Sequence, residues 1–396
     1  MVFMNKAYNL DERLKLSSSQ MKDDYLLSLQ SEVKNNLLEI GFTISPEGKL
    51  ILPENKDYYR KVQLESVNYI LQKNRKFIEK YDEKYTERYI IDGKSLDVKN
   101  ISPRLKLVEN KEDSNIFRWI KMHWSIPISA GYGRRLRYIV KNENDNSIMG
   151  IIGLDDPVYA LKCRDTFIGW SNEVKKFKLK HVMDAFVLGA VPPYSLVLGG
   201  KLIAALVSSP KIITDFNSKY NGTRSLISGE IFNGKLAAIT TASALGKSSI
   251  YDRIKIPQGS EFIHVGWTKG SGEFQFANGI YDKLYNLASQ SVQWSKNPLW
   301  GTGTRNRRVV IQEALKMLNL PSGFTYHNIK RELFFIPLGF KSVEYLKDKA
   351  KYIKYYPITQ EEISRYMLKR WVIPRSERRK EYLEFRLEDY SLMNKL

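Results

Sequence analysis

The sequence is poor in the residues that build disulfides, metal sites and membrane spans. Its single cysteine, Cys163, excludes both an intramolecular disulfide and a cysteine-based zinc site. The four histidines lack the close spacing of a metal-ligand pair, so these residues predict no metal site either. No run reaches the roughly 18 apolar residues of a membrane helix, and the first residues lack an apolar signal region. We therefore expect a cytoplasmic protein with no membrane partner.

Acidic residues are also few relative to basic ones. The 396-residue chain contains 63 Lys+Arg against 43 Asp+Glu, a formal net charge of +20. Such an excess favours an acidic partner, and for a large intracellular protein nucleic acid, most simply DNA, is the commonest. A composition of 43% hydrophobic and 27% charged residues is that of a folded globular protein.

Three regions differ in their sequence patterns. Residues 1–110 have apolar side chains at helical spacing among many charges, which predicts a helical accessory domain. Residues 111–300 alternate strand-like and helix-like segments, which predicts an α/β core with a mixed sheet. Residues 301–396 form a basic C-terminal region with a helical tail; from residue 305 on it contains 20 Lys+Arg against 11 Asp+Glu.

The core is organised around a strand, a loop and a helix. Ala185–Val191 is an apolar run suited to a buried strand, and Pro192-Pro193 ends it because proline lacks the N–H that a central ladder position needs. After a short loop, Gly199-Gly200-Lys201 leads into a helix-like pattern. Backbone N–H groups at such a helix start can bind a phosphate, although a tight turn in a buried layer has the same pattern.

Around this centre, the pattern predicts a hairpin that ends at Ile148–Leu154, a short strand at Phe167–Trp170, and a helix after it. Further on it predicts a helix at Ser248–Ile254 and a hairpin that contains Glu273–Phe276. This order resembles the layout of the GNAT acetyltransferases. That resemblance implies that acyl-coenzyme A or another phosphorylated ligand binds at Gly199, Gly200 and Lys201. The arginine/glutamine- and glycine-rich loop of that family is replaced here by Tyr194–Gly200.

A second resemblance runs from about residue 117 to residue 340. The phrases GYGRRLRYIV, GIIGLDDPVY, RDTFIGWS, LGAVPPYS, LGGKLIAALV and YHNIKRELFFIPLG occur in this order. Together they resemble the DruA family of the Druantia anti-phage defence systems. The resemblance implies a role in bacterial antiviral defence, with nucleic acid, a helicase and other defence-system proteins as partners.

Several polar side chains of the core are candidates for catalysis. Asp155 and Asp156 follow a predicted strand, where carboxylates either hold Mg²⁺ or serve as turn residues and helix caps. His123, Tyr194 and Ser195 are candidate acid–base or nucleophilic groups, although a lone histidine is more often structural. Four tryptophans could stack on unpaired bases or fill the core: Trp119, Trp124, Trp170 and Trp267.

Basic residues of two segments are candidate nucleic-acid contacts. The first segment supplies Arg134 and Arg135, and the second supplies Arg305, Arg307, Arg308, Lys330 and Arg331. Arginine and lysine at such positions would bind phosphates in a salt-sensitive way. A solvated charged face would have the same composition.

Two classes of function follow. In the first, the protein is an enzyme that modifies DNA or depends on a nucleotide, with its site in the cleft around Pro192–Lys201. In the second, it is a non-catalytic DNA-binding recognition subunit of a multi-protein defence or transposon-associated complex.

Overall fold

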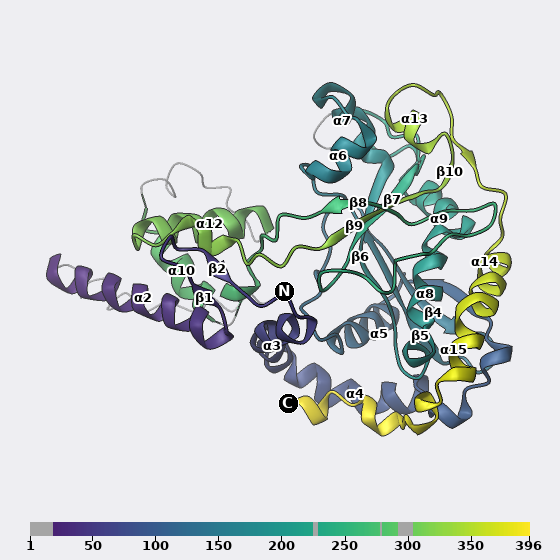
Figure 1. Cartoon of the computed structure of the whole chain (residues 1–396), viewed down its shortest axis with the longest axis horizontal. Coiled ribbons are helices and arrows are strands. Elements are labelled where there is room, and N and C mark those ends of the chain that lie inside the picture. The colour runs from purple at the N-terminus through teal and green to yellow at the C-terminus, as the bar shows by residue number, and fades with distance from the viewer. Residues whose placement is uncertain (1–18, 225–228, 278, 292–303) are drawn as a thin grey trace. The chain divides into compact units, whose positions relative to one another are not determined.

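The structure, a computed structural model, describes residues 19–224, 229–277, 279–291 and 304–396 (Figure 1). The chain divides into two compact units, and each contains two separate stretches of sequence. Unit 1 contains residues 1–66 and 270–328, and unit 2 contains residues 67–269 and 329–396. These boundaries differ from the divisions at residues 110 and 300, which stay a prediction. In the described part of the chain, no helix is both long and apolar enough to cross a membrane.

Unit 1 is mainly helical. Its elements are α2 (Ser19–Ile40), the short strands β1 (Thr43–Ile44) and β2 (Leu50–Ile51), the first part of α3 (Lys56–Lys73), α10 (Ile280–Ala288) and α12 (Thr304–Met317). Side chains of its first stretch hydrogen-bond to backbone carbonyls of its second. Gln30 Nε2 donates to Leu318 O at 2.8 Å, and Ser66 Oγ donates to Phe274 O at 2.7 Å. Distant parts of the sequence thus form one small fold.

A seven-stranded mixed sheet lies at the centre of unit 2. Its strands are β3 (Pro103–Leu107), β4 (Leu136–Asn142), β5 (Ile148–Asp155), β6 (Val182–Ala190), β7 (Ala238–Ala242), β8 (Ile263–Trp267) and β9 (Glu332–Pro337). They lie in the order β3-β4-β5-β6-β7-β9-β8, and every neighbouring pair is antiparallel except β6 and β7. The predicted α/β class with a mixed sheet is confirmed. The likeness to the GNAT layout stays a prediction.

Helices cover both faces of this sheet because successive residues of a strand place apolar side chains on opposite faces. On β4, Tyr138 and Val140 pack with α8 (Gly199–Ala205), α9 (Pro210–Tyr220) and α14 (Gln360–Met367). The residue between them, Ile139, packs on the other face with α4 (Arg75–Tyr89) and α5 (Lys111–Met122). This period of two is that of a strand buried on both sides.

A smaller hydrophobic cluster covers one end of the sheet. Its side chains come from the strands β6, β7 and β9 and from the short helices α6 (Lys162–Ile168) and α13 (Ser342–Leu346). Figure 1 shows α6, α7 (Asn172–Lys178) and α13 together at this end. Val182 of β6 belongs to this cluster. Met183 and Ala185, which lie on either side of Asp184 in the sequence, pack with α8 and α9 on the other face. Asp184 therefore shares a face with Val182.

Three sequence-based predictions of local structure are wrong. Phe167–Trp170 is the end of α6 and not a strand, because Gly169 takes a left-handed conformation that ends the helix (φ 75°). Ser248–Ile254 forms turns, in which Ser248 N donates to the Glu332 carboxylate. Phe274–Phe276 is a 3₁₀ turn, and β8 pairs with β9 across more than 60 residues of sequence. In the second and third cases a long-range contact overrides the local pattern.

The C-terminal tail is fixed to unit 2 by one buried carboxylate. Asp82 of α4 is 1% exposed, and its Oδ1 accepts a hydrogen bond from Trp119 Nε1 at 2.6 Å. Its Oδ2 accepts hydrogen bonds from Ser391 Oγ, Leu392 N and Met393 N. Removal of this side chain would leave at least Trp119 Nε1 and Leu392 N, which belong to fully buried residues, without these hydrogen bonds.

We therefore expect Asp82→Ala to lower the free energy of unfolding by about 2–4 kcal/mol, the range for a buried acceptor that serves several donors. Chemical denaturation of the full chain would measure this loss. The neighbouring exposed residue offers a matched control, and Glu83→Ala should change the free energy by less than about 0.5 kcal/mol. Equal effects of both substitutions would show that Asp82 does not hold the tail.

Candidate functional site

Two carboxylates face each other on neighbouring strands of the sheet. Asp155, the last residue of β5, pairs in register with Asp184 of β6, and Asp184 pairs with Thr240 of β7. Directly paired residues project to the same side of a sheet, so the three side chains form a row. Asp155 is 4% exposed, and Asp184 is half-buried.

A β-bulge next to this row sets its register. Gly153 pairs with Val187 and Leu154 pairs with Ala185, so Phe186 has no partner on β5. A Cβ at Gly153 would lie 2.4 Å from the ring of Phe186, which explains why glycine is needed there. Bulges of this kind redirect the side chains that follow them, and here they bring Asp155 opposite Asp184.

A glycine-containing loop before β4 binds the β5 carboxylates through its backbone. Tyr132 N donates to Asp155 Oδ2 at 3.2 Å, and Arg134 N donates to Asp156 Oδ2 at 3.0 Å. The Arg134 side chain adds a salt bridge from Nε to Asp156 Oδ1 at 2.7 Å. Gly133 lies so close to Asp156 that a Cβ there would be 2.1 Å from Oδ2. The loop and the carboxylates thus form one unit.

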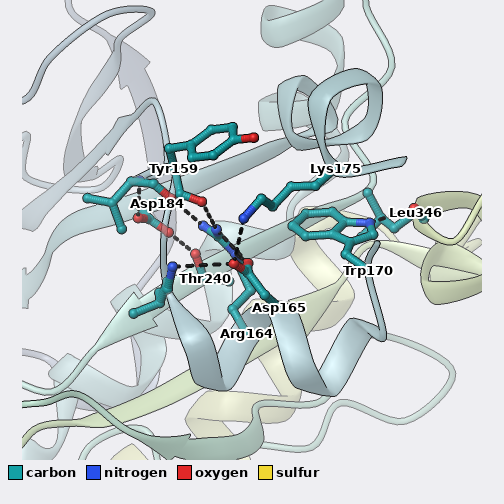
Figure 2. A network of polar contacts seen from close by, with 10 residues as sticks. Tyr159, Arg164, Asp165, Trp170, Lys175, Asp184, Thr240 and Leu346 are labelled. Carbon is teal, nitrogen blue, oxygen red and sulfur yellow. Dashed lines mark hydrogen bonds and ion pairs between the residues drawn. The ribbon is translucent and has the colours of Figure 1, made fainter. Parts of the chain in front are cut away.

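A fully buried guanidinium shapes the loop on the other side of Asp184 (Figure 2). Arg164 donates to the carbonyl oxygens of Val158 and Tyr159 at 2.9 and 3.1 Å, and to Asp165 Oδ1 at 2.7 Å. Lys175 Nζ binds the other oxygen of Asp165 at 3.1 Å. Because these bonds fix the loop, Val158 N is directed at Asp184 Oδ2, 3.4 Å away. Asp184 Oδ1 accepts a hydrogen bond from Thr240 Oγ1.

Burial raises the pKa of both carboxyl groups, and repulsion by a nearby carboxylate adds to the rise. Burial, followed by the negative charge of Asp184, raises the pKa of Asp155 to about 7. Burial also raises the pKa of Asp184 to about 6, while the positive charge of Arg164 opposes that rise. Near neutral pH, Asp155 therefore retains a proton for part of the time while Asp184 is mostly ionised. Two carboxyl groups whose pKa values differ in this way are suited to acid–base chemistry.

A basic cavity of about 530 Å³ lies beside the loop that binds the carboxylates. Four cationic side chains line it with one glycine, one valine and one tyrosine: Arg134, Arg135, Arg137, Lys219, Gly133, Val108 and Tyr220. Tyr220 Oη accepts a hydrogen bond from Arg135 N at 2.7 Å, and Lys219 Nζ donates to Arg135 O at 3.0 Å. Helix α9 therefore holds the backbone of Arg135 in place. Gly133 separates this cavity from Asp156.

The residues predicted to bind a phosphorylated ligand lie elsewhere in unit 2 and are buried. Gly199, Gly200 and Lys201 begin helix α8, which has only seven residues. Lys201 Nζ donates to the carbonyl oxygens of Ile250 and Asp252 at 2.8 and 2.7 Å, and it lies 4.5 Å from the ring centre of Trp371. Its charge is thus already bound by the chain, and ligand binding at this loop stays a prediction.

The other catalytic candidates do not join the carboxylate pair. Tyr194 is buried, and its hydroxyl lies 2.6 Å from Ser147 Oγ, whereas Ser195 is exposed. The ring of His123 stacks on Tyr390 at 3.7 Å, and burial lowers the pKa of this histidine well below its ordinary value. None of the hydrogen bonds or ring contacts found for these described residues reaches Asp155 or Asp184, so their catalytic roles stay predictions.

The second group of predicted nucleic-acid contacts is divided between the two units. Arg307 and Arg308 belong to α12 of unit 1 and lie over the rings of Tyr281 and Tyr326 at 4.3 and 5.4 Å. Lys330 and Arg331 belong to unit 2, where Lys330 is exposed and Arg331 Nε is buried without a hydrogen-bond partner. The side chain of Arg305 lies outside the described residues. Arg134 and Arg135, in contrast, line one cavity.

Sequence reasoning did not name Arg137 or Lys219 as site residues, and it considered Asp184 only with Asp155 and Asp156, as a carboxylate near a strand end. The alternation of Arg135 and Arg137 about Leu136 was a usable signal, because alternate residues of a strand share a face. Lys219 and Asp184 had no such signal. Their roles depend on which elements α9 and β6 contact.

The matches to known proteins cover this site. A sequence model of a family described as Druantia protein DruA matches residues 53–348. A curated protein from Escherichia coli (strain UMEA 4076-1), described as Druantia protein DruA, is 33% identical over 365 residues. The match covers 91% of this chain and 90% of that protein. No solved structure matches the chain.

The carboxylate pair makes the stability of the protein depend on pH. The pKa of Asp155 is about 7 in the folded protein against an ordinary value of 3.8, so the folded state binds more protons between these values. The free energy of unfolding should therefore fall as pH rises from about 4 to 7. The asparagine side chain of Asp155→Asn stays neutral at every pH. The free energy of unfolding of this variant, relative to that of the parent, should therefore be about 1–3 kcal/mol higher at pH 8 than at pH 5.

Urea unfolding of both proteins at the two pH values would measure this difference. Glu109→Gln, which removes an exposed carboxylate near the basic cavity, is the matched control and should show no comparable difference. An advantage of Asp155→Asn that is the same at pH 5 and pH 8 would contradict a raised pKa at Asp155.

Proposed function

The chain belongs to the DruA family, and from this premise we propose that it acts on nucleic acid through the Asp155–Asp184 carboxylate pair beside the basic cavity. The family resemblance predicted from the sequence is confirmed, and with it a role as a component of Druantia anti-phage defence. The observation that carries the proposal is the position of Gly133 and Arg134. Both line the basic cavity, and both contact Asp156, the neighbour of Asp155.

The basic cavity supports binding of a phosphate backbone. Arg135 and Lys219 are exposed, and the only polar partners of their side chains among the described residues are backbone carbonyl oxygens. Among the described residues, neither side chain forms a salt bridge with a carboxylate. Phosphates bind such groups with release of counterions, and the affinity falls steeply with salt.

The carboxylate pair supports proton transfer at the bound strand. Asp184 accepts hydrogen bonds from Val158 N and Thr240 Oγ1, which favour its ionised form, so it is the candidate general base. Asp155 is its buried partner, and because its pKa is raised to about 7 it is protonated for part of the time near neutral pH. This places the chemistry at the β5–β6 strand end rather than in the cleft around Pro192–Lys201, where Lys201 is already bound.

The non-catalytic alternative depends on the same cavity. In that function, the protein is a DNA-binding recognition subunit, and partners such as a helicase carry out the chemistry. The exposed positions of Arg135 and Lys219 and their lack of salt bridges among the described residues support this function equally, because they concern binding alone.

Two sets of variants separate these functions, and both would be tested for phage protection in cells with the complete defence system. Asp184→Asn should reduce protection strongly, since loss of a general base typically costs about 10²- to 10⁴-fold in rate. Its DNA affinity should stay that of the parent. The double variant Arg135→Glu, Arg137→Glu should lose DNA affinity in gel-shift titrations. Glu83→Gln, a change at an exposed residue of α4 away from the cavity lining, should behave as the parent.

A folded Asp184→Asn protein that protects fully would remove the catalytic proposal and leave the recognition subunit. Unchanged DNA binding by the double arginine variant would remove both.

A further inference from the structure

A second, mainly apolar cavity of about 260 Å³ lies next to the basic cavity. Apolar side chains of α3, α5 and the following segment line it, among them Ile70, Trp124, Ile126 and Ile128. Two cations, Arg118 and Lys121, complete the lining. A cavity with apolar walls and a few charged groups is the usual form of a small-ligand site.

The two cavities are joined by a short stretch of backbone. Ala130 lines the apolar cavity and Gly133 lines the basic one. Arg135, which lines the basic cavity, donates from its guanidinium to Ala130 O at 3.4 Å. Lys121 Nζ donates to Ser129 O at 3.1 Å, so the same segment also positions the ammonium group of the apolar cavity.

Five cations that line the two cavities form no salt bridge with a carboxylate of the described residues. Among the described residues, Arg118 donates to the amide oxygen of Asn74, and Arg137 donates to the hydroxyl of Ser114. The side chains of Lys121, Arg135 and Lys219 donate to backbone carbonyl oxygens. Burial, and then repulsion by Arg137 and Arg118, lowers the pKa of Lys121 to about 8. An anion bound beside these cations would relieve that repulsion.

One lining residue of the apolar cavity, Trp124, has an aromatic ring that the sheet holds in place. Trp124 lies against β6 so closely that a Cβ at Gly189 would be 2.2 Å from its Cζ2 atom. Gly189 is therefore required for this position of the indole. A ring that is fixed by the sheet and also lines a cavity offers a preformed surface for a flat, apolar ligand.

We propose that the apolar cavity binds one unstacked base of a single nucleic-acid strand whose phosphates lie along Arg118, Lys121, Arg137 and Arg135. This inference rests on the proposed nucleic-acid function and makes it specific for an unpaired strand. The charges of these cations select a polyanion, and the adjoining apolar cavity selects a strand with free bases, because a duplex keeps its bases stacked and paired.

Fluorescence anisotropy with the full-length protein tests this at one fixed salt concentration. The probes are an oligothymidylate, a chain of the same length built of abasic sites, and a blunt duplex. Stacking of one base contributes about 5- to 150-fold in affinity, so we expect the oligothymidylate to bind at least several-fold more tightly than the abasic chain. Equal affinities for these two probes would overturn the proposal without any variant.

A variant that fills the cavity from its exposed rim gives a second test. Ala130→Trp should lower the affinity for oligothymidylate to that for the abasic chain and leave the other two affinities unchanged. Ser125→Trp adds the same side chain at an exposed residue outside the cavity lining, and it should bind as the parent. An unchanged oligothymidylate affinity of folded Ala130→Trp would overturn the proposal.

Two further outcomes separate this inference from the proposed function. In the first, the parent binds all three probes with equal affinity, and Arg135→Glu, Arg137→Glu binds each of them more weakly. This result would support the proposed nucleic-acid function and overturn the base-binding site. If the parent binds none of the probes, both fall. Displacement of the oligothymidylate by thymidine monophosphate at equal concentration would assign the cavity to a free nucleotide and overturn the strand proposal.

Discussion

The short parallel pairing of β6 with β7 is the constraint on which unit 2 depends. It extends over only four residue pairs, from Val182 to Ala185 on β6, and it joins the antiparallel strands β3–β6 to β7, β9 and β8. The same pairing sets Asp184 beside Thr240. A shift of one residue would turn Asp184 toward α8 and α9, where the core is apolar. The register between β6 and β7 therefore determines both how the two parts of the sheet join and where Asp184 lies.

That site is held together at a cost in stability. Two carboxylates at neighbouring strand positions repel each other, and burial disfavours their ionised forms. Backbone N–H groups of Tyr132 and Val158, together with the buried guanidinium of Arg164, offset part of this cost. Arg164 does so indirectly as well, since its bonds to two carbonyl oxygens fix the loop that contains Val158 (Figure 2). Such compensation around destabilising charges is typical of functional sites.

Much of the site's composition is visible in the sequence, but its assembly is not. The phrases around Arg134–Arg135 and Asp155–Asp156 carry the family resemblance, and the alternation of Arg135 and Arg137 indicates a shared face. The partners that complete the site come from other elements. Asp184 lies on β6 and Lys219 on α9, and only strand order and helix packing bring them to the same place. No local spacing can encode such contacts.

The sequence by itself determined the α/β class, the buried central strand and the family, because hydrophobic period and ordered phrases are local properties. Tertiary structure alone decided what the polar residues do. Lys201 follows two glycines, as a phosphate-binding lysine would, yet carbonyl oxygens about 50 residues away bind its ammonium group. Trp170 lies just after a helix and not in a strand: the left-handed Gly169 ends the helix, and Leu346 O accepts the indole hydrogen bond. These outcomes depend on long-range contacts, whose free energies exceed the weak preferences of short segments.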